Sequence, residues 1–313
     1  MHFLDFEKQI IELEAKIKDL SLIDLEDIAK NKEIFSLKKE INSILKKTYS
    51  KLTPWQITQV ARHPERPHTK DYIDQFIDNF QILSGDRKYG EDKAIIGGMG
   101  SFHGYSVMVI GQEKGSDTES RISHNFGMAR PEGYRKVVRL YKLAEKFKIP
   151  IITFVDTAGA YPGVGAEERG QAEAIAKCIQ VSLEVKVPII SVIIGEGGSG
   201  GALALATANK VLMLQNSIYS VISPEGCASI LWRDNDKSEL AADSLSITAE
   251  ALKDKNIIEE IISEPIGGAH RDHKTTIRNV ENSIKNSLEE LINVSPSELI
   301  RIRSKKFISY GRL

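Results

Sequence analysis

The sequence predicts an α/β protein in which helices cover a mainly parallel β-sheet. Two strand–turn–helix units follow one another, first IPIITFVDT with the helix after it and then VPIISVII with its own helix. Both strands are continuous apolar runs, which is typical of parallel strands buried on both faces. Such runs in alternation with helices favour a sheet enclosed by helices. A chain of 313 residues is long enough for that core.

Composition argues against several other classes of protein. Lys plus Arg number 42 and Asp plus Glu 43, so the balanced charge gives no electrostatic case for nucleic-acid binding. No stretch approaches the ~20 apolar residues of a membrane span, and the first ten residues lack a signal-peptide pattern. Cys178 and Cys227 are too few for a disulfide framework or a four-thiolate zinc site. We expect a cytoplasmic protein with two reduced thiols and no metal.

Residues 1–52 predict an N-terminal helical hairpin that acts as a packing or assembly arm. Apolar residues step by three and four over residues 3–20 and again over 34–44, with charged residues around them. This spacing gives each helix one apolar stripe. Residues 21–31 suit the turn between the helices. Residues 53–313 are expected to form the second domain.

The second domain opens with a helix start signal. Thr53 is a good N-cap, Pro54 suits the first helical position, and Gln56 completes a capping box. The run RHPERPH, residues 62–68, then ends the helix and is locally basic. We expect a solvated loop stiffened by proline, with contact to an anion such as phosphate as the alternative.

Two strands and a helix are predicted before the first strand–turn–helix unit. AIIGGMGSF and YSVMVIGQ have strand character and are joined at His103 and Gly104. Helical spacing follows over residues 134–147. The first unit then continues from its strand into a turn over 158–165 and one helix over 166–185.

The last third of the chain predicts shorter elements. KVLMLQNSIYSVIS indicates further strand, and PEGCASILW indicates a short helix with Pro224 in its first turn. NIIEEIIS predicts a last short strand, and the charged tail from about His273 predicts helix.

GEGGSGG, residues 195–201, is predicted to be the turn from the second strand into its helix. Gly195, Gly197 and Gly200 fit the G-x-G-x-x-G pattern of dinucleotide-binding folds. That pattern needs an acidic residue about twenty positions later, at the end of the next strand. LMLQNS stands there and contains no carboxylate, so this interpretation is disfavoured.

The same turn fits the nucleophile elbow of a hydrolase. Ser199 has the place of the nucleophile in G-x-S-x-G. In such hydrolases an acidic residue and then a histidine follow the serine along the chain and complete the catalytic triad. Asp243 or Asp254 could be that acid, and His270 that histidine. Only this order connects His270 with Ser199.

A third interpretation needs no reactive side chain. The first N–H groups of a helix are unpaired and lie in the positive end of its dipole. Glycines let a flat group approach such a backbone closely, which makes an oxyanion hole. Gly159, Gly163 and Gly165 free the backbone of the first turn in the same way. Two such units side by side would form one cleft, unless both turns merely pack tightly.

Several blocks of the sequence resemble the carboxyltransferase alpha subunit of multi-subunit acetyl-CoA carboxylase, of the bacterial and plastid type. They are TFVDTAGAYPGVGAEERGQAEAIA, VIIGEGGSGGALA and YSVISPEGCASILW, supported by WQITQVARHPERPHTKDYI, HNFGMARPEGYRK and EPIGGAHRD. The resemblance extends from Phe3 to Tyr310. One departure is Ala158, where the family pattern DTPGAYPG has proline; alanine can adopt the same φ, so we expect a tolerated change.

The resemblance implies a crotonase-type fold, a spiral of β-β-α units with a helical C-terminus. It implies transfer of a carboxyl group from carboxybiotin to acetyl-CoA, giving malonyl-CoA for fatty acid synthesis. The implied partners are a beta subunit that carries the zinc, in an α2β2 assembly, a biotin carboxyl carrier protein, and biotin carboxylase. No cofactor is expected to be bound covalently by this chain.

The resemblance also assigns roles to backbone groups. The N–H groups of Gly200 and Gly201 would form the oxyanion hole for the biotin ureido oxygen, and Ser199 becomes a small turn residue. The implied substrate cleft consists of Gly159, Ala160, Tyr161, Gly163, Gly197 and Gly198. The alternatives are a self-sufficient hydratase or serine peptidase of the same fold, and a non-catalytic scaffold.

Overall fold

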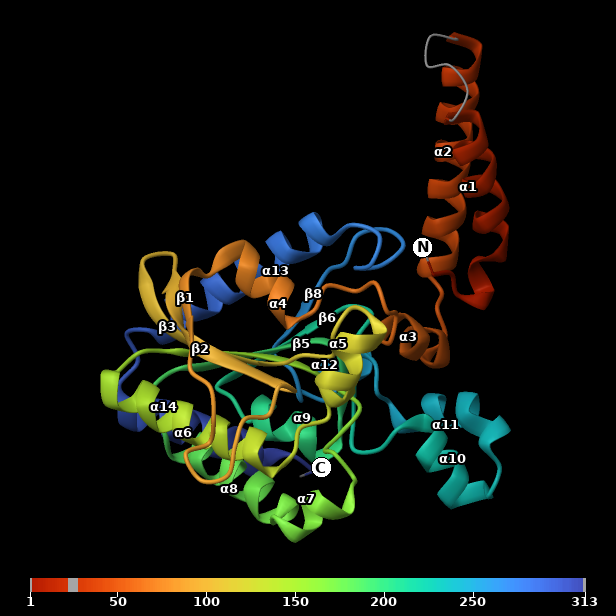
Figure 1. The fold of residues 1–313 in the computed structure, drawn as a ribbon. Coiled ribbons are helices and arrows are strands. Elements are labelled where there is room, and N and C mark those ends of the chain that lie inside the picture. Colours follow the sequence, from red (N-terminus) through yellow and green to blue (C-terminus); the bar gives the residue numbers. More distant parts are fainter. Residues whose placement is uncertain (1, 22–27, 312–313) are drawn as a thin grey trace.

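A mixed β-sheet lies between two layers of helices in the computed structural model, which describes residues 2–21 and 28–311 (Figure 1). Within those residues the sheet has eight strands in the order β1-β2-β3-β4-β5-β6-β8, and β7 pairs with β5. The strands are β1 (Asp78–Ile82), β2 (Ile95–Phe102), β3 (Tyr105–Gln112), β4 (Ile151–Thr157), β5 (Ile189–Gly198), β6 (Lys210–Leu214), β7 (Ile218–Ser220) and β8 (Glu260–Ile262).

The sheet is parallel from β3 onward, as predicted. β1, β2 and β3 are antiparallel, and β2 joins β3 at His103 and Gly104, where both residues have positive φ. Positive φ at both positions suits the tight hairpin turn that matches strand twist. Because β3 to β6 run parallel, the carboxyl ends of β4 and β5 meet at one edge of the sheet.

Most of the described helices precede the last strand, β8. They are η1 (Asp5–Glu7), α1 (Lys8–Ser21), α2 (Ile28–Tyr49), α3 (Pro54–Ala61), α4 (Thr69–Phe76), α5 (Thr118–Ser123), η2 (Asn125–Gly127), α6 (Pro131–Phe147), α7 (Val164–Glu168), α8 (Gln171–Glu184), α9 (Ser199–Ala206), α10 (Pro224–Trp232), η3 (Asn235–Lys237), α11 (Ser238–Leu245) and α12 (Ala249–Asp254). The predicted helical tail comprises α13 (His273–Leu291) and α14 (Pro296–Ser309).

The core explains why the parallel strands are apolar throughout. In β4, Ile151 and Val155 join the cluster under α6, α8 and α9, whereas Ile152 and Phe154 join the cluster under α4 and α13. Successive strand residues point to opposite faces, so a strand covered on both faces has no polar side.

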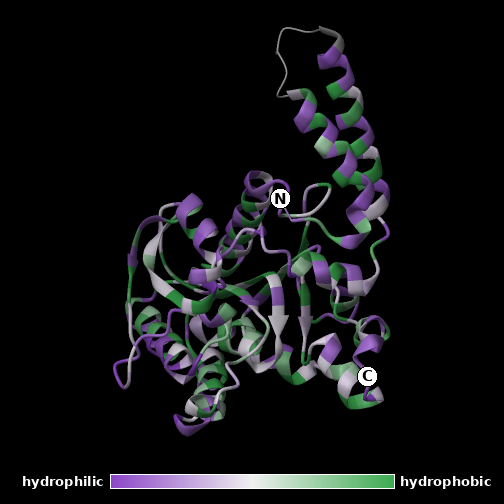
Figure 2. Ribbon diagram, turned by 45° about the vertical axis from the view of Figure 1, so that its right-hand side comes forward, coloured by the Kyte–Doolittle hydropathy of each residue, from purple (hydrophilic) through white to green (hydrophobic). Residues whose placement is uncertain are grey.

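The predicted helical hairpin is α1 with α2, and it projects from the body (Figure 1). Its helices pack through apolar residues that include Ile10 and Ile41, and Figure 2 shows hydrophobic and hydrophilic residues in alternation along it. Buried Glu7 accepts a hydrogen bond from Arg271 at 3.0 Å, which ties the hairpin to the body. Residues 22–27 of the predicted turn lie outside the described residues.

Several predicted boundaries are wrong, and two of them lie close to the candidate site. Residues 195–198 are not a turn, because β5 continues to Gly198 and α9 begins directly at Ser199. The extension is held by β7, whose Ser220 is the partner of Gly198. The single helix predicted over 166–185 is divided into α7 and α8, because Gly170 has φ +79° and interrupts the helical backbone.

Candidate functional site

The two strand–turn–helix units meet at the carboxyl edge of β4 and β5, backbone against backbone. A Cβ added at Gly198 would lie 2.2 Å from the carbonyl oxygen of Ala158. A Cβ at Gly201 would lie 2.7 Å from the carbonyl carbon of Gly159. Only glycine fits at such distances, so these positions keep the end of β5 and the first turn of α9 in direct contact with the turn that follows β4.

Helix α9 begins with a sharp change of direction. Ser199 has φ +53°, an uncommon value for a residue other than glycine. The N-cap, Gly198, provides no side-chain hydrogen bond to the helix. The first N–H groups of α9 therefore lack both an intrahelical acceptor and a side-chain cap, and they carry the positive end of the helix dipole.

An apolar cavity of about 410 Å³ lies beside this helix start. Its walls come from α9, β7, the helices α11 and α12, and the end of α14. Gly200 lies in the cavity wall, whereas Gly201 is buried against the first turn. The lining residues are Ser199, Gly200, Leu203, Tyr219, Ser220, Val221, Leu245, Leu252, Ile257, Phe307 and Tyr310.

The first turn is stiffened by its own hydrogen bonds. The hydroxyl of Thr157 donates to the carbonyl of Gly159 at 2.7 Å and accepts from its N–H at 3.1 Å. Tyr161 packs against Gly163, and the guanidinium of Arg130 lies 4.6 Å from its ring centroid. Among the described residues that line the apolar cavity, none comes from this turn. Gly197 lies within β5 and packs against Tyr219, which does line the cavity.

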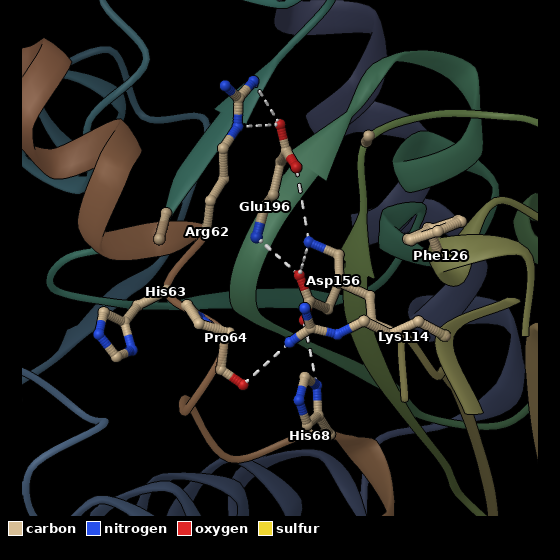
Figure 3. A pocket seen from close by; sticks show the side chains of 11 residues that line it. Arg62, His63, Pro64, His68, Lys114, Phe126, Asp156 and Glu196 are labelled. Carbon is tan, nitrogen blue, oxygen red and sulfur yellow. Dashed lines mark hydrogen bonds and ion pairs between the residues drawn. The ribbon is translucent and has the colours of Figure 1, made fainter. Parts of the chain in front are cut away.

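A charged cluster of Arg62, Lys114, Asp156 and Glu196 occupies the same sheet edge (Figure 3). Lys114 lies 2.7 Å from Asp156 and 3.5 Å from Glu196, and Arg62 lies 2.7 Å from Glu196. These residues border a cavity of about 250 Å³, and His68 forms another part of its wall. Burial alone would lower the pKa of Lys114, but Asp156 and Glu196 outweigh it and raise that pKa.

The prediction that residues 62–68 form a solvated loop is wrong, because much of this segment is buried. Arg66 is only 2% exposed and forms a two-pronged ion pair with Glu264 at 3.0 and 2.7 Å. His63 is buried as well. The loop packs against the edge of the sheet. There its Arg62 and Arg66 form ion pairs with Glu196 and Glu264, which come from distant segments of the chain. Burial alone would raise the pKa of Glu264, but Arg66 more than offsets this, so that pKa is lowered.

The hydrolase triad is not formed. His270 stacks on His63 with ring centroids 3.8 Å apart, and neither of its ring nitrogens has a hydrogen-bond partner among the described residues. Burial and the neighbouring His63 lower the pKa of His270 to about 2. Asp243 and Asp254 are exposed. Ser199 therefore has neither a base nor an orienting acid in contact with it.

Metal and membrane features are absent from the part of the chain that the structure describes. No group of three or more His, Cys, Asp or Glu side chains is placed to hold a metal ion there. Cys178 and Cys227 are free and buried. No helix among residues 2–21 and 28–311 is both long and apolar enough to cross a bilayer.

Comparison with known families decides among the interpretations. The family described as acetyl co-enzyme A carboxylase carboxyltransferase-like matches residues 3–311. The chain belongs to this family. It is 55% identical to the alpha subunit of acetyl-coenzyme A carboxylase carboxyl transferase from Rhodospirillum centenum, over 100% of this chain and 99% of that protein. It is 56% identical to the same subunit of Paramagnetospirillum magneticum, with the same coverage.

Solved structures show the same fold at low identity. Transcarboxylase 12S superimposes with a TM-score of 0.60 at 18% identity, over 72% of this chain and 42% of that one. A subunit of a Pseudomonas malonate decarboxylase hetero-tetramer gives 0.58 at 14% identity, over 71% and 89%. The predicted family, the crotonase-type α/β fold and the transferase class are confirmed; the hydratase and peptidase alternatives find no support.

Sequence reasoning missed the charged cluster and Gln112, whose Oε1 accepts a hydrogen bond from the N–H of Asp156 at 3.1 Å. A signal for the cluster was present: Asp156 and Glu196 are acidic residues at the ends of two otherwise apolar strands. Residues that end parallel strands share one edge of the sheet, where sites form. Phe307 and Tyr310, in the cavity wall, carried no comparable signal.

Proposed function

We propose that this chain supplies the half of a carboxyltransferase site that holds the ureido oxygen of carboxybiotin. Together with a beta subunit it transfers the carboxyl group to acetyl-CoA and gives malonyl-CoA. The observation that carries the proposal is the start of α9, where unpaired N–H groups adjoin an apolar cavity. An apolar cavity with a few polar groups at one end is the usual form of a small-molecule site.

The chemistry follows from fixed dipoles. The N–H groups of Gly200 and Gly201 hold negative charge as it develops on the ureido oxygen, and one such donor is worth about 3 kcal/mol of barrier. Ser199 supplies shape and not a nucleophile. Gly159, Ala160, Tyr161 and Gly163 support the helix start from the adjacent turn, together with Gly197 and Gly198. Apolar walls exclude water and strengthen the interaction.

The proposed partners are a zinc-carrying beta subunit in an α2β2 assembly, a biotin carboxyl carrier protein and biotin carboxylase, all in the cytoplasm. Large apolar side chains on α10 and α11 are exposed to solvent in the isolated chain, and they support the proposal of an interface with a partner subunit. Ile230 is 71% exposed, Leu231 64% and Leu240 50%. Clustered exposure of this kind is typical of a protein–protein contact.

Reconstitution tests the proposal. We would measure malonyl-CoA decarboxylation with free biotin as acceptor for this chain alone, for the beta subunit alone, and for their mixture. Activity in the mixture only is expected. Activity of this chain alone would contradict the proposal and support a self-sufficient enzyme of the same fold. Inactivity of a complex whose assembly has been verified would support a non-catalytic scaffold.

The backbone group is tested by replacing Gly200 with glycolic acid, which changes its amide to an ester. This removes the N–H and also makes the Ser199 carbonyl a weaker hydrogen-bond acceptor. We expect kcat to fall about 10²- to 10³-fold. Gly200→Ala is the matched control, since it keeps the N–H and its Cβ would lie 3.5 Å from Ile175. Ser199→Ala should retain most of the activity. Full activity of the ester variant would remove Gly200 from the mechanism.

A further inference from the structure

Gln112 connects the two strand–turn–helix units through one buried amide. It is the last residue of β3 and is 0% exposed. Its Nε2 donates a hydrogen bond to the carbonyl of Gly201 at 2.8 Å. Its Oε1 accepts one from the N–H of Asp156 at 3.1 Å. A single side chain thus spans from the end of β4 to the first turn of α9.

The orientation of this amide is dictated by its partners. A backbone N–H can only donate and a backbone carbonyl can only accept. If the Gln112 amide were flipped, its NH2 group would face the N–H of Asp156 and its oxygen would face the carbonyl of Gly201. Only the observed orientation therefore forms both hydrogen bonds. The main chain of Gln112 is also held, because its carbonyl accepts from the hydroxyl of Thr69 at 2.5 Å.

The start of α9 packs closely against Gly159, but it has few side-chain hydrogen bonds to hold it. The helix has eight residues, SGGALALA, and its N-cap offers no side-chain bond. Among the described residues, Gln112 alone makes a side-chain hydrogen bond to the segment Ser199–Gly201. Gly200, which lies in the cavity wall, would otherwise leave this turn with much conformational freedom.

We propose that Gln112 is a positioning residue that fixes the first turn of α9, and with it the N–H of Gly200, relative to the end of β4. This inference rests on the proposed function, because it assigns Gln112 to the same oxyanion site. Gln112 does not touch the substrate. It acts through the Gly201 carbonyl to which it donates a hydrogen bond. Without the Gln112 side chain, the N–H of Gly200 could move away from the ureido oxygen whose negative charge it stabilises.

Gln112→Met is the first test, since methionine has a similar length and forms neither bond. In the reconstituted complex we expect kcat of the reverse reaction to fall about 10- to 100-fold, because a displacement of 1 Å costs on the order of 10². KM for malonyl-CoA should stay within about threefold.

Asn209→Leu is the matched control. Asn209 is also a buried amide that bridges two elements: it accepts from the N–H of Ile189 at 3.1 Å and donates to the carbonyl of Leu299 at 2.9 Å. Its Oδ1 also accepts from Nε of the buried Arg303 at 3.2 Å, so the variant should lose more stability than the bridge alone supplies. It lies at the opposite end of β5 from the candidate site. We expect it to lower the midpoint of urea unfolding while kcat stays within about threefold of the wild type.

Gln112→Glu supplies a second readout that does not depend on the stability of the methionine variant. A protonated carboxyl can donate to Gly201 and accept from Asp156, whereas a carboxylate repels the Gly201 carbonyl. Its kcat relative to the wild type should therefore rise as pH is lowered from 8 to 6.

Two results would overturn the proposal: a folded Gln112→Met complex with unchanged kcat, or a Gln112→Glu profile parallel to that of the wild type. Failure of the proposed function is seen separately, as an inactive wild-type complex or an unimpaired ester variant at Gly200.

Discussion

Replacement of Gly201 by alanine tests whether the contact between the first turn of α9 and the turn after β4 sets the geometry of the site. The added Cβ would lie 2.7 Å from the carbonyl carbon of Gly159 and 2.9 Å from the amide nitrogen of Ala160. Both atoms belong to the backbone, so no side-chain rotation can relieve the overlap. Gly200→Ala is the natural control, because its nearest neighbour is a methyl of Ile175 at an ordinary 3.5 Å.

The size of the effect follows from that overlap. A distance of 2.7 Å is about 0.7 Å short of the 3.4 Å at which ordinary contacts begin, so the turns must separate by about that amount. Since a displacement of 1 Å costs on the order of 10² in rate, we expect kcat to fall about 20-fold. Overpacking should also lower the free energy of unfolding by about 1–3 kcal/mol.

The assay is malonyl-CoA decarboxylation by the reconstituted complex, with urea unfolding of the purified chain in parallel. Gly200→Ala should match the wild type in stability, or gain slightly because alanine favours helix. If Gly201→Ala were as active and as stable as the wild type, the close contact between the turns would have no bearing on the site.

Three further predictions concern groups away from α9. The folded chain holds His270 neutral with a pKa of about 2, below its ordinary 6.5, so stability is lost as pH falls below 6.5. At pH 5 this amounts to about 2 kcal/mol in urea unfolding. His270→Leu should remove this part of the dependence and leave the smaller part due to His63, whose pKa burial also lowers. Glu264→Gln leaves the Arg66 charge buried and unpaired and should cost about 3–5 kcal/mol by chemical denaturation; a loss below about 1 kcal/mol would contradict this. Thr53→Ala removes the cap that accepts from the N–H of Gln56 and should cost about 1 kcal/mol in thermal unfolding, whereas Thr53→Ser should be nearly neutral.

Local features were predictable wherever local chemistry decides them. Thr53 and Gln56 form the predicted capping box, with reciprocal bonds of 3.2 and 2.9 Å. The hairpin at His103 and Gly104, the short helix at Pro224 and the amphipathic arm also agree with their patterns. Each depends on residues a few positions apart, or on periodicity within one element.

Several short elements escaped prediction. β1 is mostly exposed and lacks the alternation of a half-buried strand, and α4, α5, α11 and α12 are each eight residues or fewer. Elements of this length are stabilised by the body on which they pack more than by their own propensity. A single-sequence pattern therefore says little about them.

The sequence by itself determined the α/β class, the buried parallel strands and the family, because apolar periodicity and long specific motifs lie within contiguous segments. Tertiary structure alone decided that β5 extends to Gly198, since the extension needs β7 as a partner. It also decided that the basic loop is buried, because the carboxylates that pair with Arg62 and Arg66 lie 134 and 198 positions away. A buried charge is strongly destabilising unless it forms an ion pair, and only the tertiary structure places these carboxylates beside the two arginines.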